Sequence, residues 1–238
     1  MVTISENAKH DIVRLLGIDE RKIVVTPLAP NPMVCMPAGA PGSPDTRAIL
    51  DRYHIVAPFI LTVAGLGLHK NSLMLVRALK ELHRAPDYRG VSLVITGRDY
   101  GAGPEVRREV ERLGLGDKVV FAGFVDAADL ATLYACCAAY GSMSRFEGFG
   151  MTAVEAMACG APVLVSNCGS LPEVVGDAAL LAPPDDVEAI ADKIRRFLQD
   201  GELRKKYIAR GYRRAADFSW DRTARLTLQT YLEAAAQQ

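Results

Sequence analysis

The sequence has few cysteines, no long hydrophobic run and no excess of charge of either sign, and each shortage excludes a class of protein. Its five cysteines show no C-x-x-C spacing, which argues against a zinc site and against a disulfide framework. They are Cys35, Cys136, Cys137, Cys159 and Cys168. We therefore expect reduced, buried thiols, no bound metal, and a cytoplasmic location.

The apolar residues form no membrane segment. No run approaches the ~20 apolar residues that span a bilayer, and the first six residues, MVTISE, lack the apolar core of a secretory signal. Lys plus Arg and Asp plus Glu each total 28 in the 238 residues, so neither a nucleic acid nor an acidic membrane surface is an expected partner. Hydrophobic residues make up 50% of the chain, which predicts a globular protein with a substantial core.

Short apolar runs alternate with segments of helical periodicity over most of the chain. The predicted strands are 60–64, 91–96, 118–121, 137–141, 162–166 and 179–181. The predicted helices between them are 72–84, a segment through Val106, Val110 and Leu113, 129–135, 152–159 and 171–175. Near-continuous apolar strands that alternate with helices are typical of a parallel sheet covered on both faces. The predicted fold class is α/β, with a doubly wound, Rossmann-like parallel sheet.

Both ends of the chain fall outside this alternation. Residues 27–44 are predicted as an extended linker without a helix or strand, because they contain six prolines: Pro27, Pro30, Pro32, Pro37, Pro41 and Pro44. We also expect a helix over 5–16, a strand over 23–26, and helices over 187–198, 202–216 and 219–235. The predicted organisation is a hinge segment with linker over 1–57, a Rossmann-like domain over 58–218, and a separate last helix over 219–238.

One turn has the strongest ligand-binding pattern. Ligands of parallel sheets bind beyond the carboxyl ends of the strands, where helix N-termini present free N–H groups. Four turns lie at such ends, over 65–71, 97–103, 123–127 and 145–152. In the last, Gly148 and Gly150 let the backbone approach a ligand, and Glu147 and Glu155 could accept hydrogen bonds from sugar hydroxyls. The pattern suits a phosphate flanked by two polyols, although two glutamates at this spacing are also common on solvated surfaces.

Residues 147–181, EGFGMTAVEAMACGAPVLVSNCGSLPEVVGDAALL, resemble the donor-site signature of retaining glycosyltransferases of the GT-B fold, family 4 (group 1). Further segments resemble that family in the same order along the chain: VTISENAKHDIVRLLGIDERKIVVTPLAPN, HKNSLMLVRAL, VSLVITG, LGLGDKVVFAGFVDAADLATLYACC and FSWDRTARLTLQTYL. Members of the family have an acceptor-binding domain followed by a donor-binding domain. This chain resembles only the hinge segment and the C-terminal, donor-binding half.

The resemblance implies roles for individual residues. Glu147 would contact hydroxyls of the transferred sugar beside the reacting centre, and Lys70 would neutralise charge on the departing diphosphate. Glu155 would hold the ribose hydroxyls of the nucleotide. The diphosphate would bind the backbone of Gly148, Phe149, Gly150 and Met151, and the base pocket would be lined by Phe124 and Val125. The implied reaction is sugar transfer from a nucleotide-diphosphate sugar with retention of anomeric configuration, without a metal ion or further cofactor.

Some positions depart from the family pattern. Leu66 and His69 stand where family members commonly carry an arginine. The phosphate clamp is therefore expected to be weaker, since a histidine is only partly charged near neutral pH. Gly141 stands where a proline is frequent. Arg98 and Arg145 could reach a phosphate or a base, but exposed arginines on turns are also common without a ligand.

The absent acceptor domain leaves three alternatives open. The favoured one is that the chain is a piece of a longer transferase; the others are one half of a split enzyme with a separate acceptor subunit, and a nucleotide-sugar-binding module without catalysis. Resemblance to mannosyltransferases favours GDP-mannose over UDP- and ADP-sugars as the donor. The last helix is expected to expose apolar residues or to bury them in a homodimer. Any peripheral attachment to the inner face of a membrane would come from the missing domain.

Overall fold

Six parallel strands form the centre of the structure, a computed structural model that describes residues 1–35, 39–63 and 65–236. The strands are β3 (Phe59–Val63), β4 (Ser92–Thr96), β5 (Val119–Gly123), β6 (Ala139–Ser142), β7 (Val163–Ser166) and β8 (Leu180–Ala182). Their order across the sheet is β5-β4-β3-β6-β7-β8, and every pair is parallel. The predicted doubly wound α/β fold is confirmed. Pro37 and Ala64, which belong to the predicted linker and first strand, lie outside the described residues.

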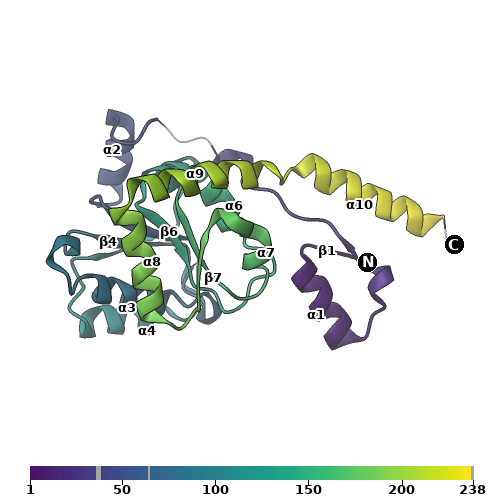
Figure 1. Cartoon of the computed structure of the whole chain (residues 1–238), viewed down its shortest axis with the longest axis horizontal. Helices are drawn as coiled ribbons and strands as arrows, with labels where there is room; N and C mark the ends of the chain where they lie inside the picture. The colour runs from purple at the N-terminus through teal and green to yellow at the C-terminus, as the bar shows by residue number, and fades with distance from the viewer. Residues whose placement is uncertain (36–38, 64, 237–238) are drawn as a thin grey trace.

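Helices cover both faces of this sheet (Figure 1). One face packs against α3 (Ser72–Leu82), α4 (Gly103–Arg112) and α8 (Val187–Gln199), and the other against α5 (Ala127–Cys136), α6 (Met151–Ala158) and α7 (Leu171–Val175). The strands are apolar on both sides because both sides are covered: Phe59, Ile60 and Leu61 are all fully buried. Helix α9 (Gly201–Ala216) then packs against α6 and α8.

The proline-rich region contains more regular structure than expected. The prediction of no element over 27–44 is wrong at Pro32–Val34, which forms a 3-10 turn, and at Pro44, where helix α2 (Pro44–Arg52) begins. Ser43 caps this helix and Pro44 occupies its first turn, where a missing N–H costs nothing. Arg52 and Tyr53 both donate to Asp129 Oδ2 on α5, at 2.6 and 2.8 Å.

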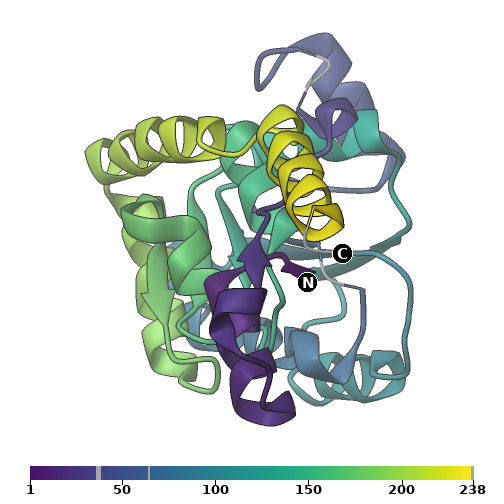
Figure 2. The same cartoon turned by 90° about the vertical axis from the view of Figure 1, so that its right-hand side faces the viewer.

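Two parts of the chain project from the sheet domain on one side (Figures 1 and 2). The first comprises β1 (Val2–Thr3), α1 (Glu6–Leu16) and β2 (Val24–Val25), in which the two strands pair in parallel. The second is α10 (Trp220–Ala235), which contains no buried residue. No helix in the described part of the chain is long and apolar enough to cross a membrane.

Candidate functional site

The candidate site lies where the strand order reverses, between β3 and β6. In doubly wound sheets the connections on the two sides of this point lead to opposite faces, which opens a crevice at the carboxyl ends of the strands. The turns after β3 and β6 meet there, since the Arg145 N–H donates to the His69 carbonyl oxygen at 2.9 Å. The fold therefore brings the predicted residues Lys70 and Glu147 to one place.

Lys70 and Glu147 form an ion pair in this crevice. Lys70 Nζ lies 2.6 Å from Glu147 Oε1, and the same oxygen accepts a hydrogen bond from Ser144 Oγ at 2.9 Å. The two side chains keep 22% and 14% of their surface exposed, so a ligand can reach both. Ser170 fixes the Glu147 backbone by donating to its carbonyl oxygen from its N–H at 3.3 Å and from its hydroxyl at 2.9 Å.

Two glycines shape the turn around Glu147. Gly169 has φ of +59°, and a Cβ there would lie 3.0 Å from the backbone N and O of Glu147, so a larger residue would displace the glutamate. Gly150 has φ of +94° directly before α6, and a Cβ there would lie 2.5 Å from Leu171 Cδ2. Both positions require glycine for their backbone conformation and for the close approach of a neighbour.

The N-terminus of α6 is left open toward ligands. No side chain caps the helix. Within the described residues, the backbone N–H groups of Gly148–Met151 donate no hydrogen bond. Phe149 anchors this turn, because its ring is buried and packs edge-on against Phe218 at 5.4 Å between centroids. Free N–H groups at a helix start, with the partial positive charge of the helix dipole, can bind an anion such as a phosphate.

Glu155 has different surroundings from Glu147. It is 6% exposed on α6, where one carboxylate oxygen accepts from the Asn31 N–H at 3.4 Å and the other faces the Tyr134 hydroxyl at 3.5 Å. Burial is the main cause that raises the pKa of the Glu155 carboxyl above its usual value. The 3-10 turn at Pro32–Val34 lies beside it, since Sγ of Cys159, the residue that directly follows α6, donates to the Val34 carbonyl oxygen at 2.8 Å.

The two residues predicted for the base pocket follow β5 and differ in exposure. Phe124 is 70% exposed, and the Arg98 guanidinium carbon lies 6.0 Å from its ring centroid. Val125 is buried in the core, so only its backbone is available to a ligand. Phe124 and Arg98 together form an exposed aromatic and cationic surface at the β4–β5 end of the carboxyl edge.

Some residues of the site carry no clear sequence signal. Ser144 and Ser170, which hold Glu147, are ordinary serines until the fold places them. Tyr100 lines a cavity of about 460 Å³ together with Lys70, His69, Leu68 and Gly67. Its ring lies against Gly65, where a Cβ would come within 2.9 Å of it. Among the described residues, no cluster of His, Cys, Asp or Glu could hold a metal ion.

Comparisons with known proteins agree with this architecture. Residues 56–214 match the family model of glycosyl transferases group 1. The O-antigen chain mannosyltransferase B of Escherichia coli is 34% identical over 233 residues, a match that covers 97% of this chain and 60% of that protein. A glycosyltransferase of Rickettsia africae has a TM-score of 0.85 at 25% identity, covering 98% of this chain and 62% of that one.

A further structural match shares the fold at lower identity. It is the Anabaena protein HepE, solved with UDP-glucose, with a TM-score of 0.82 at 20% identity; the match covers 99% of this chain and 63% of HepE. The chain thus spans about three fifths of the length of each of these three proteins. With a GT-B-type sheet and a family match over most of its residues, the chain belongs to the group 1 glycosyl transferases.

Proposed function

We propose that this chain is the donor-binding half of a retaining glycosyltransferase that takes a sugar from a nucleotide-diphosphate sugar. The observation that carries the proposal is the Lys70–Glu147 pair at the switch point, next to the open N-terminus of α6. A cation and free N–H groups suit a diphosphate, and a carboxylate beside them suits sugar hydroxyls.

Each group has a role in the proposed transfer. When the bond from the sugar to the diphosphate breaks, its electron pair leaves on the diphosphate, where negative charge grows. Lys70 and the N–H groups of Gly148–Met151 stabilise that charge, and one such contact typically contributes a few kcal/mol. A bound diphosphate competes with Glu147 for Lys70, which frees the Glu147 carboxylate to accept from hydroxyls of the sugar. These groups take the place of a metal ion.

The nucleotide extends from this centre along the sheet edge. Glu155 accepts from the ribose hydroxyls, and Phe124 with the backbone of Val125 lines the base pocket. GDP-mannose is the favoured donor, because the Escherichia coli relative is a mannosyltransferase. The HepE complex with UDP-glucose supports a nucleotide-diphosphate sugar as the ligand class.

The acceptor is proposed to bind a separate N-terminal domain, as part of a longer protein or as another subunit. The chain covers 60% of its mannosyltransferase relative, which leaves room for such a domain. The projecting α1 and α10 supply apolar surface for it: Leu15, Leu16, Leu228 and Leu232 are each 59–67% exposed. We expect donor binding by this chain alone and sugar transfer only with the acceptor domain present.

Thermal unfolding with GDP, UDP and ADP tests the proposal. A ligand that binds only the folded chain stabilises it by about 2.7 kcal/mol at 100 times its dissociation constant. We expect GDP to raise the melting temperature most and guanosine to raise it little. If no nucleoside diphosphate shifts the transition at millimolar concentration, the proposal is wrong. Transfer assays with and without an added acceptor domain then separate a split enzyme from a binding module.

A further inference from the structure

Arg98 and Phe124 lie side by side at the β4–β5 end of the carboxyl edge. They follow neighbouring strands, and their turns are joined where the Gly97 N–H donates to the Gly123 carbonyl oxygen at 2.7 Å. Phe124 is 70% exposed, and the Arg98 guanidinium carbon lies 6.0 Å from its ring centroid. Val125, the next residue, is buried in the core and fixes the backbone of this turn. A flat group that stacks on Phe124 would therefore lie within reach of Arg98.

The Arg98 guanidinium has no polar partner in the described part of the chain. It forms no hydrogen bond or ion pair there and contacts the Phe124 ring. The adjacent carboxylate, Asp99, is engaged elsewhere, because its Oδ1 accepts from the N–H groups of Gly101 and Gly103 at 2.8 and 3.0 Å. Arg98 is also exposed, so its five N–H donors are available to a ligand.

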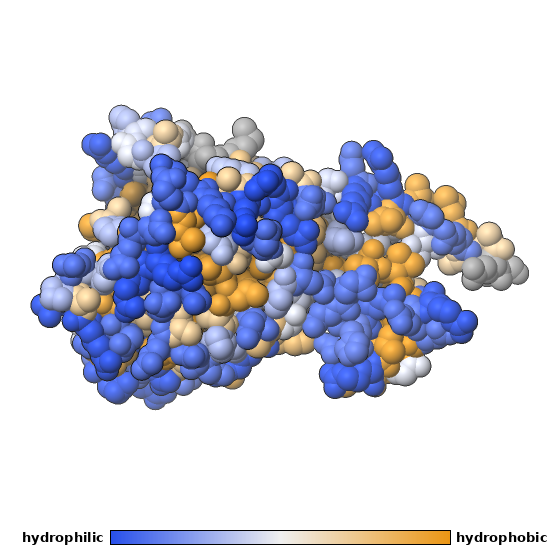
Figure 3. Space-filling model, in the orientation of Figure 1, coloured by the Kyte–Doolittle hydropathy of each residue, from blue (hydrophilic) through white to orange (hydrophobic). Residues whose placement is uncertain are grey.

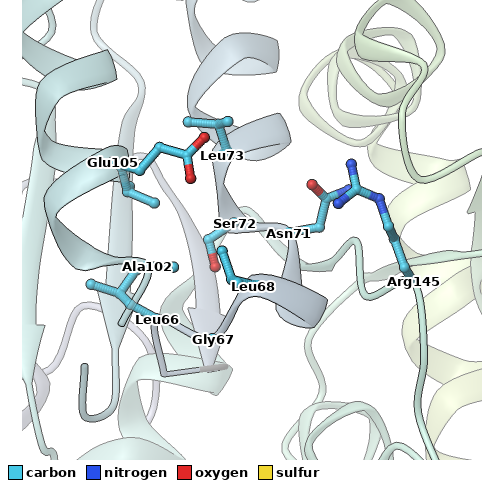
Figure 4. Close-up of a pocket in the computed structure, with 10 residues that line it drawn as sticks. Leu66, Gly67, Leu68, Asn71, Ser72, Leu73, Ala102, Glu105 and Arg145 are labelled. Atoms are coloured by element: carbon cyan, nitrogen blue, oxygen red, sulfur yellow. The ribbon is translucent and has the colours of Figure 1, made fainter. Parts of the chain in front are cut away.

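Arg145, the other arginine that could reach a nucleotide, is already paired. Its guanidinium lies beside Asn71 (Figure 4) and donates to Asp185 Oδ1 at 2.7 Å. The Asn71 side chain donates to the same oxygen at 3.3 Å, which holds the three groups together. Arg145 therefore stabilises the 67–71 turn, whereas Arg98 remains available.

The turn that carries Arg98 does not suit a phosphate. The N–H groups of Tyr100 and Ala102 donate to the Leu66 carbonyl oxygen at 3.1 and 2.9 Å, and two more are bound by the carboxylate described above. The open N–H groups at the start of α6 lie instead beside the turn that carries Lys70. A diphosphate is expected there, so the part of a nucleotide left for Arg98 is the base.

Stacking and hydrogen bonding contribute differently to the choice of base. Every base can stack on an aromatic ring, so Phe124 strengthens binding without selecting among bases. A guanidinium is a planar fork of N–H donors, and guanine presents two acceptors side by side, N7 and O6. Adenine has an amino group in place of O6, and uracil has a single acceptor, O4, on that edge. We infer that Arg98 selects a guanine nucleotide as the donor, an inference that rests on the proposed binding of a nucleotide-diphosphate sugar.

Calorimetry of the whole chain with GDP, ADP, UDP, inosine diphosphate and 7-deaza-GDP tests the inference. Inosine diphosphate keeps N7 and O6 and lacks only the 2-amino group, so it should bind as tightly as GDP. The other three should each bind on the order of tenfold more weakly than GDP, because each offers Arg98 one acceptor in place of two. Inosine diphosphate that binds much more weakly than GDP would show that the 2-amino group decides the choice, and would overturn the inference.

Arg98→Ala should lower the affinity for GDP and inosine diphosphate on the order of tenfold and leave ADP and UDP nearly unchanged. Arg98→Lys keeps the charge without the fork, so it should lose the preference for guanine as well. Arg107→Ala is the matched control, since Arg107 is also exposed and its guanidinium carbon lies 4.0 Å from the Phe121 ring centroid, but on α4. The control should keep the native preference. The melting temperature should stay unchanged in Arg98→Ala, because the lost side chain is exposed and forms no hydrogen bond within the described residues.

Two results with the variants would overturn the inference. If Arg98→Ala weakens GDP, ADP and UDP equally, or if Arg98→Lys keeps the native preference, only the charge of Arg98 matters. A native chain that binds the three nucleotides equally would also contradict the choice of guanine, while the proposed donor site would stand. A chain that binds no nucleoside diphosphate would contradict the proposed function itself.

Discussion

Lys70 and Glu147 belong to different strand connections, and their ion pair exists only because β3 and β6 are neighbours in the sheet. The pair sets the charge balance of the candidate site. The positive charge of Lys70 stabilises the Glu147 carboxylate at the place where a diphosphate is expected. A bound diphosphate therefore has to compete with Glu147 for the lysine. Donor affinity therefore depends on both residues together, and single variants have to be interpreted with the partner in mind.

Lys70→Ala should weaken the binding of GDP by about 10- to 100-fold, since a hydrogen bond to a charged group is worth about 1.5–3 kcal/mol. Guanosine, which lacks the diphosphate, should bind nearly as before. Calorimetry with both ligands measures the difference, and Lys206→Ala, an exposed lysine on α9, is the control.

Part of that loss comes from the unpaired Glu147 carboxylate, which would repel the diphosphate. The double variant Lys70→Ala with Glu147→Gln should recover some GDP affinity for this reason. Equal weakening of GDP and guanosine by Lys70→Ala would contradict its assignment to the diphosphate.

Glu155→Gln should raise the stability of the ligand-free chain at pH 7 and lower its affinity for GDP on the order of tenfold. Because burial raises the pKa of Glu155, its contribution to stability is fully present below the unfolded value of 4.5 and is lost as pH rises through the folded pKa. A neutral amide avoids that loss and still accepts from the Asn31 N–H. The gain over the native chain should therefore be largest at neutral pH and should fade as the solution is acidified.

Thermal unfolding between pH 4 and 8 measures this gain in Glu155→Gln. Glu147→Gln is the control with the opposite sign, since it removes the ion pair with Lys70 and should lower the melting temperature. A Glu155→Gln chain that is less stable at every pH would show that the ionised carboxylate is well solvated or paired in the folded state.

At the scale of helices and strands, the sequence is sufficient to predict an element wherever its apolar periodicity is strong. All six strands of the sheet were predicted within two residues of their observed ends. The sequence does not predict helix α2, because six prolines within 18 residues indicate a linker, whereas Pro44 at the first turn after a capping serine begins a helix. Lys70 and Glu147, which the resemblance places in the site, form an ion pair, but the supporting serines and the enclosure of Glu155 by residues 31–34 depend on long-range packing. Such contacts leave no local pattern in a single sequence.

Glu109 joins α4 to α3, and its removal should destabilise the domain. Its carboxylate, 10% exposed, accepts from Arg77 and Arg112, with both closest distances at 2.7 Å. Hydrogen bonding, first from Arg112, lowers the pKa of Glu109 from 4.5 to about 2. One pKa unit corresponds to about 1.4 kcal/mol, but the arginines are 42% and 66% exposed and water screens them. For Glu109→Gln we therefore expect a loss of about 1–2 kcal/mol in the free energy of unfolding.

The pH dependence of that loss identifies its cause. The contribution of Glu109 is present above the unfolded pKa of 4.5 and is lost as pH falls through about 2. Urea unfolding of Glu109→Gln and native chain should differ at pH 7 and converge near pH 2. A difference that persists unchanged at pH 2 would indicate lost packing rather than a lost ion pair. Glu111→Gln, at an exposed position two residues further along the same helix, should differ from the native chain at neither pH.

On the scale of the whole molecule, the fold divides into a packed sheet domain and two projections, α1 with its strands and α10. The helices of both projections contain no buried residue. Helix α1 is fixed to α7 at its first turn, where the N–H groups of Glu6 and Asn7 donate to the Glu173 carboxylate at 2.9 and 2.8 Å. Helix α10 is fixed at its start by Trp220, whose Nε1 donates to the Pro30 carbonyl oxygen at 3.1 Å. Figure 3 shows apolar surface on this projecting side of the molecule. Both projections are anchored at one end and expose apolar residues along the rest. Exposed apolar surface of this kind is typical of a protein–protein interface.

In the chain by itself, we expect the apolar face of α10 to drive concentration-dependent self-association. Leu228, Tyr231 and Leu232 recur at helical spacing and are 59%, 63% and 62% exposed. Full burial of a leucine is worth about 1.5–3 kcal/mol, so Leu228→Lys with Leu232→Lys should weaken a dimer by at least ~100-fold. Sedimentation at several concentrations measures this, and Gln229→Lys, which can pair with Glu233, is the control for added charge. Two results would contradict this expectation. A native chain that is monomeric at every concentration would show that this face does not bind a second copy. A double variant that still dimerises would show that the interface lies elsewhere.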